Sequence, residues 1–203
     1  MNEEQKDILD YEWQQRAARI DSDILREFPV TLMDQKVLQQ VIKQLKPRMK
    51  LFSFFEEFEF YDDELLIFLE ENLKDHNWKQ IDWEEHNQVI PLMFGPVYTY
   101  CLPGIIRGIL YDSFNFDVTI VSETFIVSFL YPTIVQADVE RFDFNSLTSK
   151  QQKIVFDVVV LLRDLMFFDN PQIQEMANEI ICACPDSLKG SETTETKREN
   201  GRD

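Results

Sequence analysis

Histidine, cysteine and acidic side chains could do chemistry in this chain, but their spacing matches none of the common site patterns. His76 and His86 are ten residues apart, whereas a helical zinc site needs two histidines four apart. A metal site can be drawn with Glu84 and Glu85, but two solvated histidines are the simpler interpretation. The sequence also contains no phosphate-binding glycine loop, no G-x-G-x-x-G fingerprint and no nucleophile elbow. It therefore predicts no catalytic residue, no metal and no cofactor.

Cysteine usage gives an expectation about the compartment. The three cysteines are an odd number, and the first seven residues are acidic and polar, unlike a secretory signal. We therefore expect reduced thiols in a cytoplasmic protein. Cys182 and Cys184 lack the two-residue gap of redox and zinc pairs. We expect them, like Cys101, to pack as small hydrophobic side chains.

Net charge is the property that most restricts the function. The 203 residues include 37 acidic and 20 basic ones, for a charge of -17, which suits neither nucleic acid nor an anionic membrane surface. Residues 51–90 hold twelve acids, two bases and many aromatic residues, whereas residues 25–50 carry +4. Acids beside aromatic residues are typical of a surface that binds a basic protein, because charge speeds encounter and rings anchor the contact. A solvated acidic face over a Phe-rich core is the alternative.

Hydrophobic periodicity predicts a mainly α protein. Apolar residues recur at steps of three and four over residues 13–28, 33–45, 65–73, 154–166 and 173–181. We expect a single-domain bundle of about six to eight helices over residues 1–188, followed by a disordered charged tail over 189–203. A short strand pair in 51–61 or 113–135 stays open, since both segments are aromatic or β-branched.

Prolines and capping residues predict where the helices begin and end. We expect boundaries at Pro29, Thr31, Pro47, Pro103, Ser122, a capping box of Thr148 and Gln151, an Asn170–Pro171 start and Pro185. Gly104 and Gly108, four residues apart, should leave one side of a helix smooth, so that a neighbouring element can approach closely. The uncharged stretch over 89–106 contains three prolines and two glycines, so we expect it to be buried in the protein instead of crossing a membrane.

Three motifs carry a resemblance to a known family. They are the tryptophan segment over 77–81, Tyr100-Cys101-Leu102-Pro103-Gly104, and Leu147-Thr148-x-x-Gln151. In this order they resemble an uncharacterised family of small bacterial, mostly helical domains with the pattern W…YYLPA…LTxxQ…FL, over about residues 63 to 168. Cys101 and Gly104 stand where the pattern prefers Tyr and Ala. The resemblance implies a bacterial, cytosolic, helical domain and no catalytic residue.

These observations favour a non-enzymatic protein-binding module, most concretely a bacterial immunity protein or antitoxin that neutralises a basic, nuclease-like toxin. The alternative is an adaptor or homodimeric scaffold that uses apolar surface around residues 98–130. An enzyme using Cys101 or a His/Glu metal site is the least favoured hypothesis. The expected partner is a basic protein, not a nucleic acid or a membrane. The expected binding residues are Glu56, Glu57, Glu59, Phe60, Tyr61, Asp62, Asp63, Glu64, Trp83, Glu84 and Glu85.

Overall fold

The computed structural model describes residues 3–52, 64–83, 85–111, 118–136, 142–167 and 170–189, and every regular element in these ranges is helical. This confirms the mainly α prediction. Residues 118–135, for which a strand was an alternative, are helical, as are 51–52, while 53–61 lie outside the described residues. The predicted charged tail also lies outside them from residue 190 onward.

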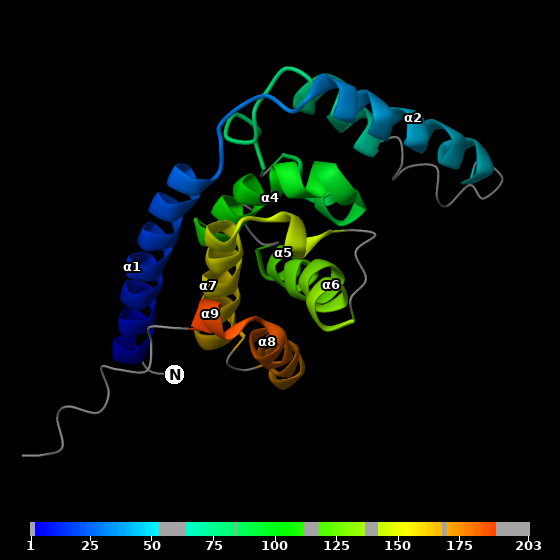
Figure 1. Ribbon diagram of the computed structural model, residues 1–203. Coiled ribbons are helices and arrows are strands. Elements are labelled where there is room, and N and C mark those ends of the chain that lie inside the picture. The colour runs from blue at the N-terminus through cyan, green and yellow to red at the C-terminus, as the bar shows by residue number, and fades with distance from the viewer. Residues whose placement is uncertain are drawn as a thin grey trace, which may run out of the picture.

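Helix α7 (Ser149–Leu165) lies at the centre of the packing. Helix α1 (Glu3–Glu27) runs alongside it, and α8 (Pro171–Ala183) and the short α9 (Asp186–Lys189) also pack against it (Figure 1). Eight of its seventeen residues are buried, among them Ile154, Val158 and Leu162. Helix α7 is therefore a central core helix of the described part of the chain.

Helix α4 (Gly95–Leu110) is a second buried element and contacts both α1 and α2 (Gln35–Phe52). After it, a helical run passes through α5 (Val118–Thr124), a π-helix η4 (Phe125–Leu130) and α6 (Tyr131–Val135). Earlier, a helical segment over 64–67 continues into a second π-helix, η1 (Phe68–Leu73). Two short 3₁₀ turns, η2 (Asn87–Leu92) and η5 (Phe144–Ser146), complete the described elements. In Figure 1, α2 extends to one side of the body that α1, α4 and α7 form.

The first two helices differ from the prediction at their boundaries. Helix α1 is one helix and ends before Pro29, as expected. Helix α2 is capped by Asp34 instead of Thr31: the Lys36 amide donates to Asp34 Oδ1 at 2.7 Å. Helix α2 also continues through Pro47 to Phe52. A proline removes one helical hydrogen bond, but its fixed φ is compatible with a helix, so Pro47 does not end it.

The start of α4 was also predicted wrongly. The helix begins at Gly95, with Pro96 in its first turn, and Pro103 lies inside it. Gly95 has a φ of 51°, in the left-handed region that glycine adopts without strain. Pro96 therefore has the role that we assigned to Pro103. Ser122 likewise lies within α5 and is fully buried, so it caps no helix.

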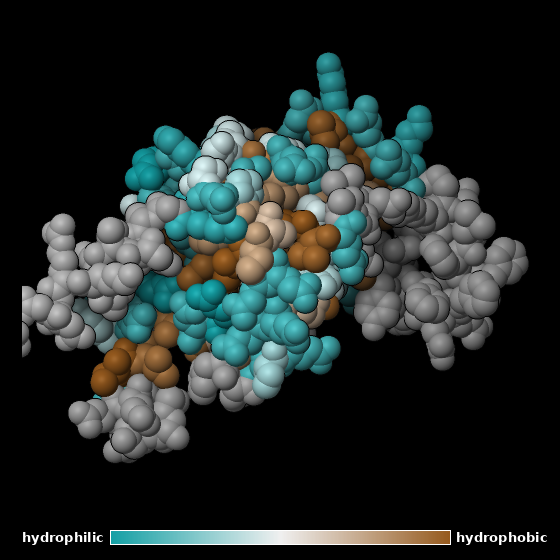
Figure 2. All heavy atoms as spheres, turned by 60° about the horizontal axis from the view of Figure 1, so that its bottom comes forward, coloured by the Kyte–Doolittle hydropathy of each residue, from teal (hydrophilic) through white to brown (hydrophobic). Residues whose placement is uncertain are grey.

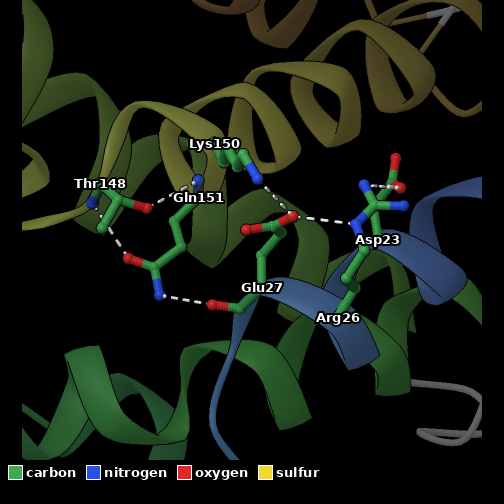
Figure 3. A network of polar contacts seen from close by, with 6 residues as sticks. All are labelled: Asp23, Arg26, Glu27, Thr148, Lys150 and Gln151. Atoms are coloured by element: carbon green, nitrogen blue, oxygen red, sulfur yellow. Dashed lines mark hydrogen bonds and ion pairs between the residues drawn. The ribbon is translucent and has the colours of Figure 1, made fainter.

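The end of α1 and the start of α7 share one polar network (Figure 3). The predicted capping box is present: the Gln151 amide donates to Thr148 Oγ1, and the Thr148 amide donates to Gln151 Oε1 at 3.0 Å. Gln151 Nε2 also donates to the backbone oxygen of Glu27 at 3.0 Å. Ion pairs with Arg26 (2.9 Å) and Lys150 (3.2 Å) hold the Glu27 carboxylate, and the bond from Arg26 lowers its pKa. Gln151 thus completes the ends of two helices at once.

We expect the Gln151→Ala variant to lose about 1–2 kcal/mol of unfolding free energy. The change removes the reciprocal half of the capping box and the bond to Glu27 O, whereas the helix propensity of alanine is favourable. Urea unfolding followed by circular dichroism measures the loss. Lys150→Ala is the control, because its exposed ion pair should contribute less than about 0.5 kcal/mol. Equal stability of the two variants would contradict the role of Gln151.

Candidate functional site

Most residues of the predicted partner-binding set lie outside the described part of the chain, namely 56–63 and 84. Of the remaining three, Glu64 is half-buried at the start of the helical segment before η1, and Glu85 is exposed just before η2. Trp83 is buried, with 7 % of its surface exposed. Of these three predicted binding residues, only Glu85 is therefore fully accessible to a partner.

Trp83 does not fit the expected role of an exposed anchor. Its indole Nε1 donates to the backbone oxygen of Trp78 at 3.0 Å, and its ring lies against Gly104 of α4. A Cβ on Gly104 would lie within 2.7 Å of three atoms of that ring. The predicted smooth side of α4 is therefore present, and the element that approaches it is the Trp83 side chain. Trp83 is a core residue because a glycine leaves room for it.

Ion pairs among the described residues hold most of the acidic side chains of α1 and α7. Arg16 pairs with Glu12 at 3.5 Å and with Asp164 at 3.3 Å, and Arg107 pairs with Asp21 at 2.5 Å. The other ion pairs join Arg26 to Asp23 and Glu27, Lys150 to Glu27, Lys153 to Asp157, Arg163 to Asp164, and Lys189 to Asp186. Most described acids of α1 and α7 thus have a basic partner, whereas Asp7 and Asp10 of α1 are exposed and form no ion pair with a described residue.

Within residues 64–85, several acidic side chains have no ion-pair partner among the described residues. Glu64, Glu71, Asp75 and Glu85 form no ion pair with any described residue. Glu71, Asp75 and Glu85 are exposed. The uneven charge predicted from the sequence therefore continues into the structure as a set of acidic side chains that form no ion pair with a described residue, although Lys74 lies between two of them.

A pocket opens beside Trp83, between the loop over 78–83 and the glycine side of α4. Its volume is about 290 Å³, and it is lined by Trp78, Lys79, Ile81, Asp82, Trp83, Gly104, Arg107, Gly108 and Tyr111. Both indoles already donate their N–H groups, Trp78 to the backbone oxygen of Pro29 at 3.0 Å and Trp83 to Trp78. What these two rings can still offer to a ligand is apolar surface.

The polar wall of the pocket is fixed by Asp21 of α1. Asp21 Oδ1 accepts from Arg107 Nε at 2.5 Å, and Oδ2 accepts from the Tyr111 hydroxyl at 3.0 Å. This contact joins residues 86 and 90 positions apart, so no local spacing in the sequence could indicate it. The spacing of Gly104 and Gly108 was the one local signal that this side of α4 is open.

Nucleophilic and metal chemistry finds no support among the described side chains. Cys101 is fully buried, and burial raises the pKa of its thiol, so it stays protonated. Burial likewise raises the pKa of Cys184 to about 11, and Cys182, expected to be buried, is exposed. The described residues contain no group of three potential metal ligands. Among them, no helix is long and apolar enough to cross a membrane.

The apolar surface proposed for a homodimer is covered within the chain. Tyr98 and Leu102 are fully buried, as are Phe129 and Leu130 of η4. On the face drawn in Figure 2, the coloured residues are mostly hydrophilic, and apolar areas lie between them. The large apolar side chains that are exposed are scattered along the chain: Ile8, Tyr11, Leu25, Val30, Leu32, Ile67 and Tyr111. Among the described residues of 98–130, most of the apolar side chains therefore lie in the core, while Tyr111 is exposed; the homodimer stays a prediction.

No family model, curated protein or solved structure matches this chain. The resemblance to the family of small bacterial domains therefore stays a prediction. Its motifs have structural roles here, since residues 100–104 lie within α4 and Thr148 and Gln151 cap α7. They position elements and supply no reactive group.

Proposed function

We propose that the protein is a non-enzymatic binding protein, most concretely a bacterial immunity protein or antitoxin that neutralises a basic, nuclease-like toxin in the cytoplasm. The observation that supports this proposal is the uneven neutralisation of charge. Ion pairs hold most of the described acids of α1 and α7, all except Asp7 and Asp10, whereas Glu71, Asp75 and Glu85 are exposed without an ion-pair partner among the described residues.

Unpaired acids on one segment make a field that attracts a cationic protein. Residues 51–90 contain twelve acids and two bases. Like charges close together on a surface repel each other, and binding of a basic partner relieves this repulsion. Such a surface raises the association rate more than the final affinity. Glu56, Glu57, Glu59, Asp62 and Asp63 precede Glu64 directly in the chain and extend the same acidic run. In this proposal Phe60 and Tyr61 are the aromatic anchors, and Trp83 supports the segment from inside.

The test compares two triple variants that change the net charge equally. Glu71→Lys, Asp75→Lys and Glu85→Lys reverse the acidic segment, and Asp7→Lys, Asp10→Lys and Glu175→Lys reverse exposed acids elsewhere. A basic protein retained from an extract of the source organism is purified, and its association rate is measured by surface plasmon resonance at low and high salt. We expect the first variant to associate at least about tenfold more slowly at low salt and the control within about twofold of wild type.

Two results would contradict the proposal. One is the retention of no basic protein by the wild type. The other is equal slowing of the two variants, because a loss that depends only on net charge does not place the partner at residues 64–85. A nuclease assay of the partner distinguishes an immunity protein from an adaptor. An immunity protein should inhibit the partner's nuclease activity, and the first variant should lose this inhibition.

A further inference from the structure

The pocket beside Trp83 holds cationic groups in an acidic protein. Arg107 and Lys79 line it, although the chain as a whole carries -17. Lys79 is exposed and forms no ion pair with a described residue. Of the acids, Asp82 also lines the pocket and accepts the Glu85 amide at 3.2 Å. Asp82 and Asp21, which pairs with Arg107, offset these two charges, so the groups that a ligand with a negative charge could use are Lys79 and the outer nitrogens of Arg107.

The contacts of Arg107 leave its two terminal guanidinium nitrogens available to a ligand. Its Nε donates to Asp21 Oδ1, and the Tyr111 hydroxyl occupies Asp21 Oδ2. The two terminal guanidinium nitrogens, Nη1 and Nη2, make no hydrogen bond to a described residue. These two nitrogens form the fork that binds a carboxylate through two parallel hydrogen bonds. Because Asp21 already fixes the guanidinium, little side-chain entropy is lost on binding.

The rest of the pocket suits a flat apolar group. Trp78 and Trp83 line the pocket as buried rings, 1 % and 7 % exposed, and their N–H groups are already used. Gly104 and Gly108 also line the pocket, although both are buried and the ring of Trp83 covers Gly104. Tyr111 adds an aromatic ring at 51 % exposure. Aromatic and apolar walls with a few placed polar groups are the usual composition of small-molecule sites.

We propose that this pocket binds a small aromatic carboxylate. The carboxylate takes the two free nitrogens of Arg107 with Lys79 beside it, and the ring lies among the indoles and the two glycines. A volume of about 290 Å³ equals roughly ten waters at ~30 Å³ each, which sets a ligand on the order of ten non-hydrogen atoms. The proposal does not rest on the acidic partner-binding segment, since it uses cations and a different ligand class.

The experiment follows the tryptophan indole N–H signals by NMR while phenylacetate is added to the full-length protein. We expect saturable shifts with a Kd of about 1 mM or tighter, as befits so small a ligand. Phenylacetamide, which has the same shape without the charge, should bind at least about tenfold more weakly. Arg107→Lys keeps the charge but loses the fork, and should weaken phenylacetate binding by about fivefold or more.

Two further variants keep the test decisive if Arg107→Lys affects folding. Lys79→Met changes an exposed side chain and should weaken binding by about twofold to fivefold. Lys36→Met removes an exposed lysine of α2 that does not line the pocket, and should leave binding unchanged. Absence of saturable shifts at 5 to about 10 mM phenylacetate, roughly ten times the expected Kd, overturns the proposal. Equal binding of the amide, or equal binding by the Lys79→Met variant and wild type, overturns it as well.

Discussion

The Phe129→Ala variant is expected to lose about 3–5 kcal/mol of unfolding free energy, the largest effect that the structure predicts. Phe129 lies in η4, is fully buried, and stacks on Tyr98 of α4 with ring centroids 3.8 Å apart at an interplanar angle of 11°. Tyr98 in turn meets the edge of the Phe142 ring at 5.4 Å. Removing the Phe129 ring, which stacks on the central Tyr98 ring, leaves a cavity between α4 and η4.

Such a loss is a large part of the stability of an ordinary domain, which is about 5–15 kcal/mol. The Phe129→Leu variant is therefore measured as well. Leucine keeps most of the volume of the side chain, so this variant should lose only about 1–1.5 kcal/mol of unfolding free energy. Tyr11→Ala is the matched aromatic control: Tyr11 is 66 % exposed and should change stability by less than about 0.5 kcal/mol. Guanidinium unfolding measures all three. A loss below about 1 kcal/mol for Phe129→Ala would contradict the stacked core.

The Gly104→Ala variant should lose about 2 kcal/mol, although alanine is the better helix former. The exchange gains up to about 1 kcal/mol of helix propensity. Against this, the added methyl would lie within 2.7 Å of Nε1, Cε2 and Cζ2 of Trp83. The ring is buried and fixed by its bond to Trp78 O, so it cannot turn away without losing that bond. With three ring atoms this close, the overpacking cost should reach about 3 kcal/mol, the upper end of the usual range, which exceeds the gain by about 2 kcal/mol.

A double-mutant cycle assigns this loss to the one contact. Trp83→Leu alone leaves a gap beside Gly104, and Gly104→Ala alone overfills it, so the double variant should recover at least about 1 kcal/mol relative to the sum of the single losses. Thermal unfolding followed by circular dichroism provides the four stabilities. If the two losses simply add, the Gly104–Trp83 contact is not the cause, and helix α4 tolerates a methyl group at this position.

Local chemistry explains which parts of the fold could be predicted. The capping box of Thr148 and Gln151 and the start at Asn170 and Pro171 rest on contacts within three residues, and the structure has both. The errors occurred where local signals compete. Pro96 and Pro103 both could begin a helix, and the left-handed Gly95 decides in favour of the first.

The candidate sites divide in the same way. The uneven charge was visible in the sequence, because counting acids needs no tertiary information. The burial of Trp83 was not visible in the sequence. A tryptophan next to acidic residues gives the same local sequence whether its ring faces the solvent or packs on Gly104. The pocket was missed as a whole: Asp21 meets Arg107 across 86 residues, and only the fold brings the two helices together.

The position of these long-range contacts also sets an order of events during synthesis. The bonds that α1 makes outside its own helix reach Arg107, Leu110, Tyr111, Lys150, Gln151 and Asp164. At roughly 5–20 residues per second, a ribosome needs several seconds between Asp21 and Arg107. During that interval the apolar stripe of α1, with Ile20, Ile24 and Phe28, has no native surface to cover it. Helix α1 is thus made well before the helices that it packs against, and until α7 is complete its apolar stripe is a surface that chaperones can bind.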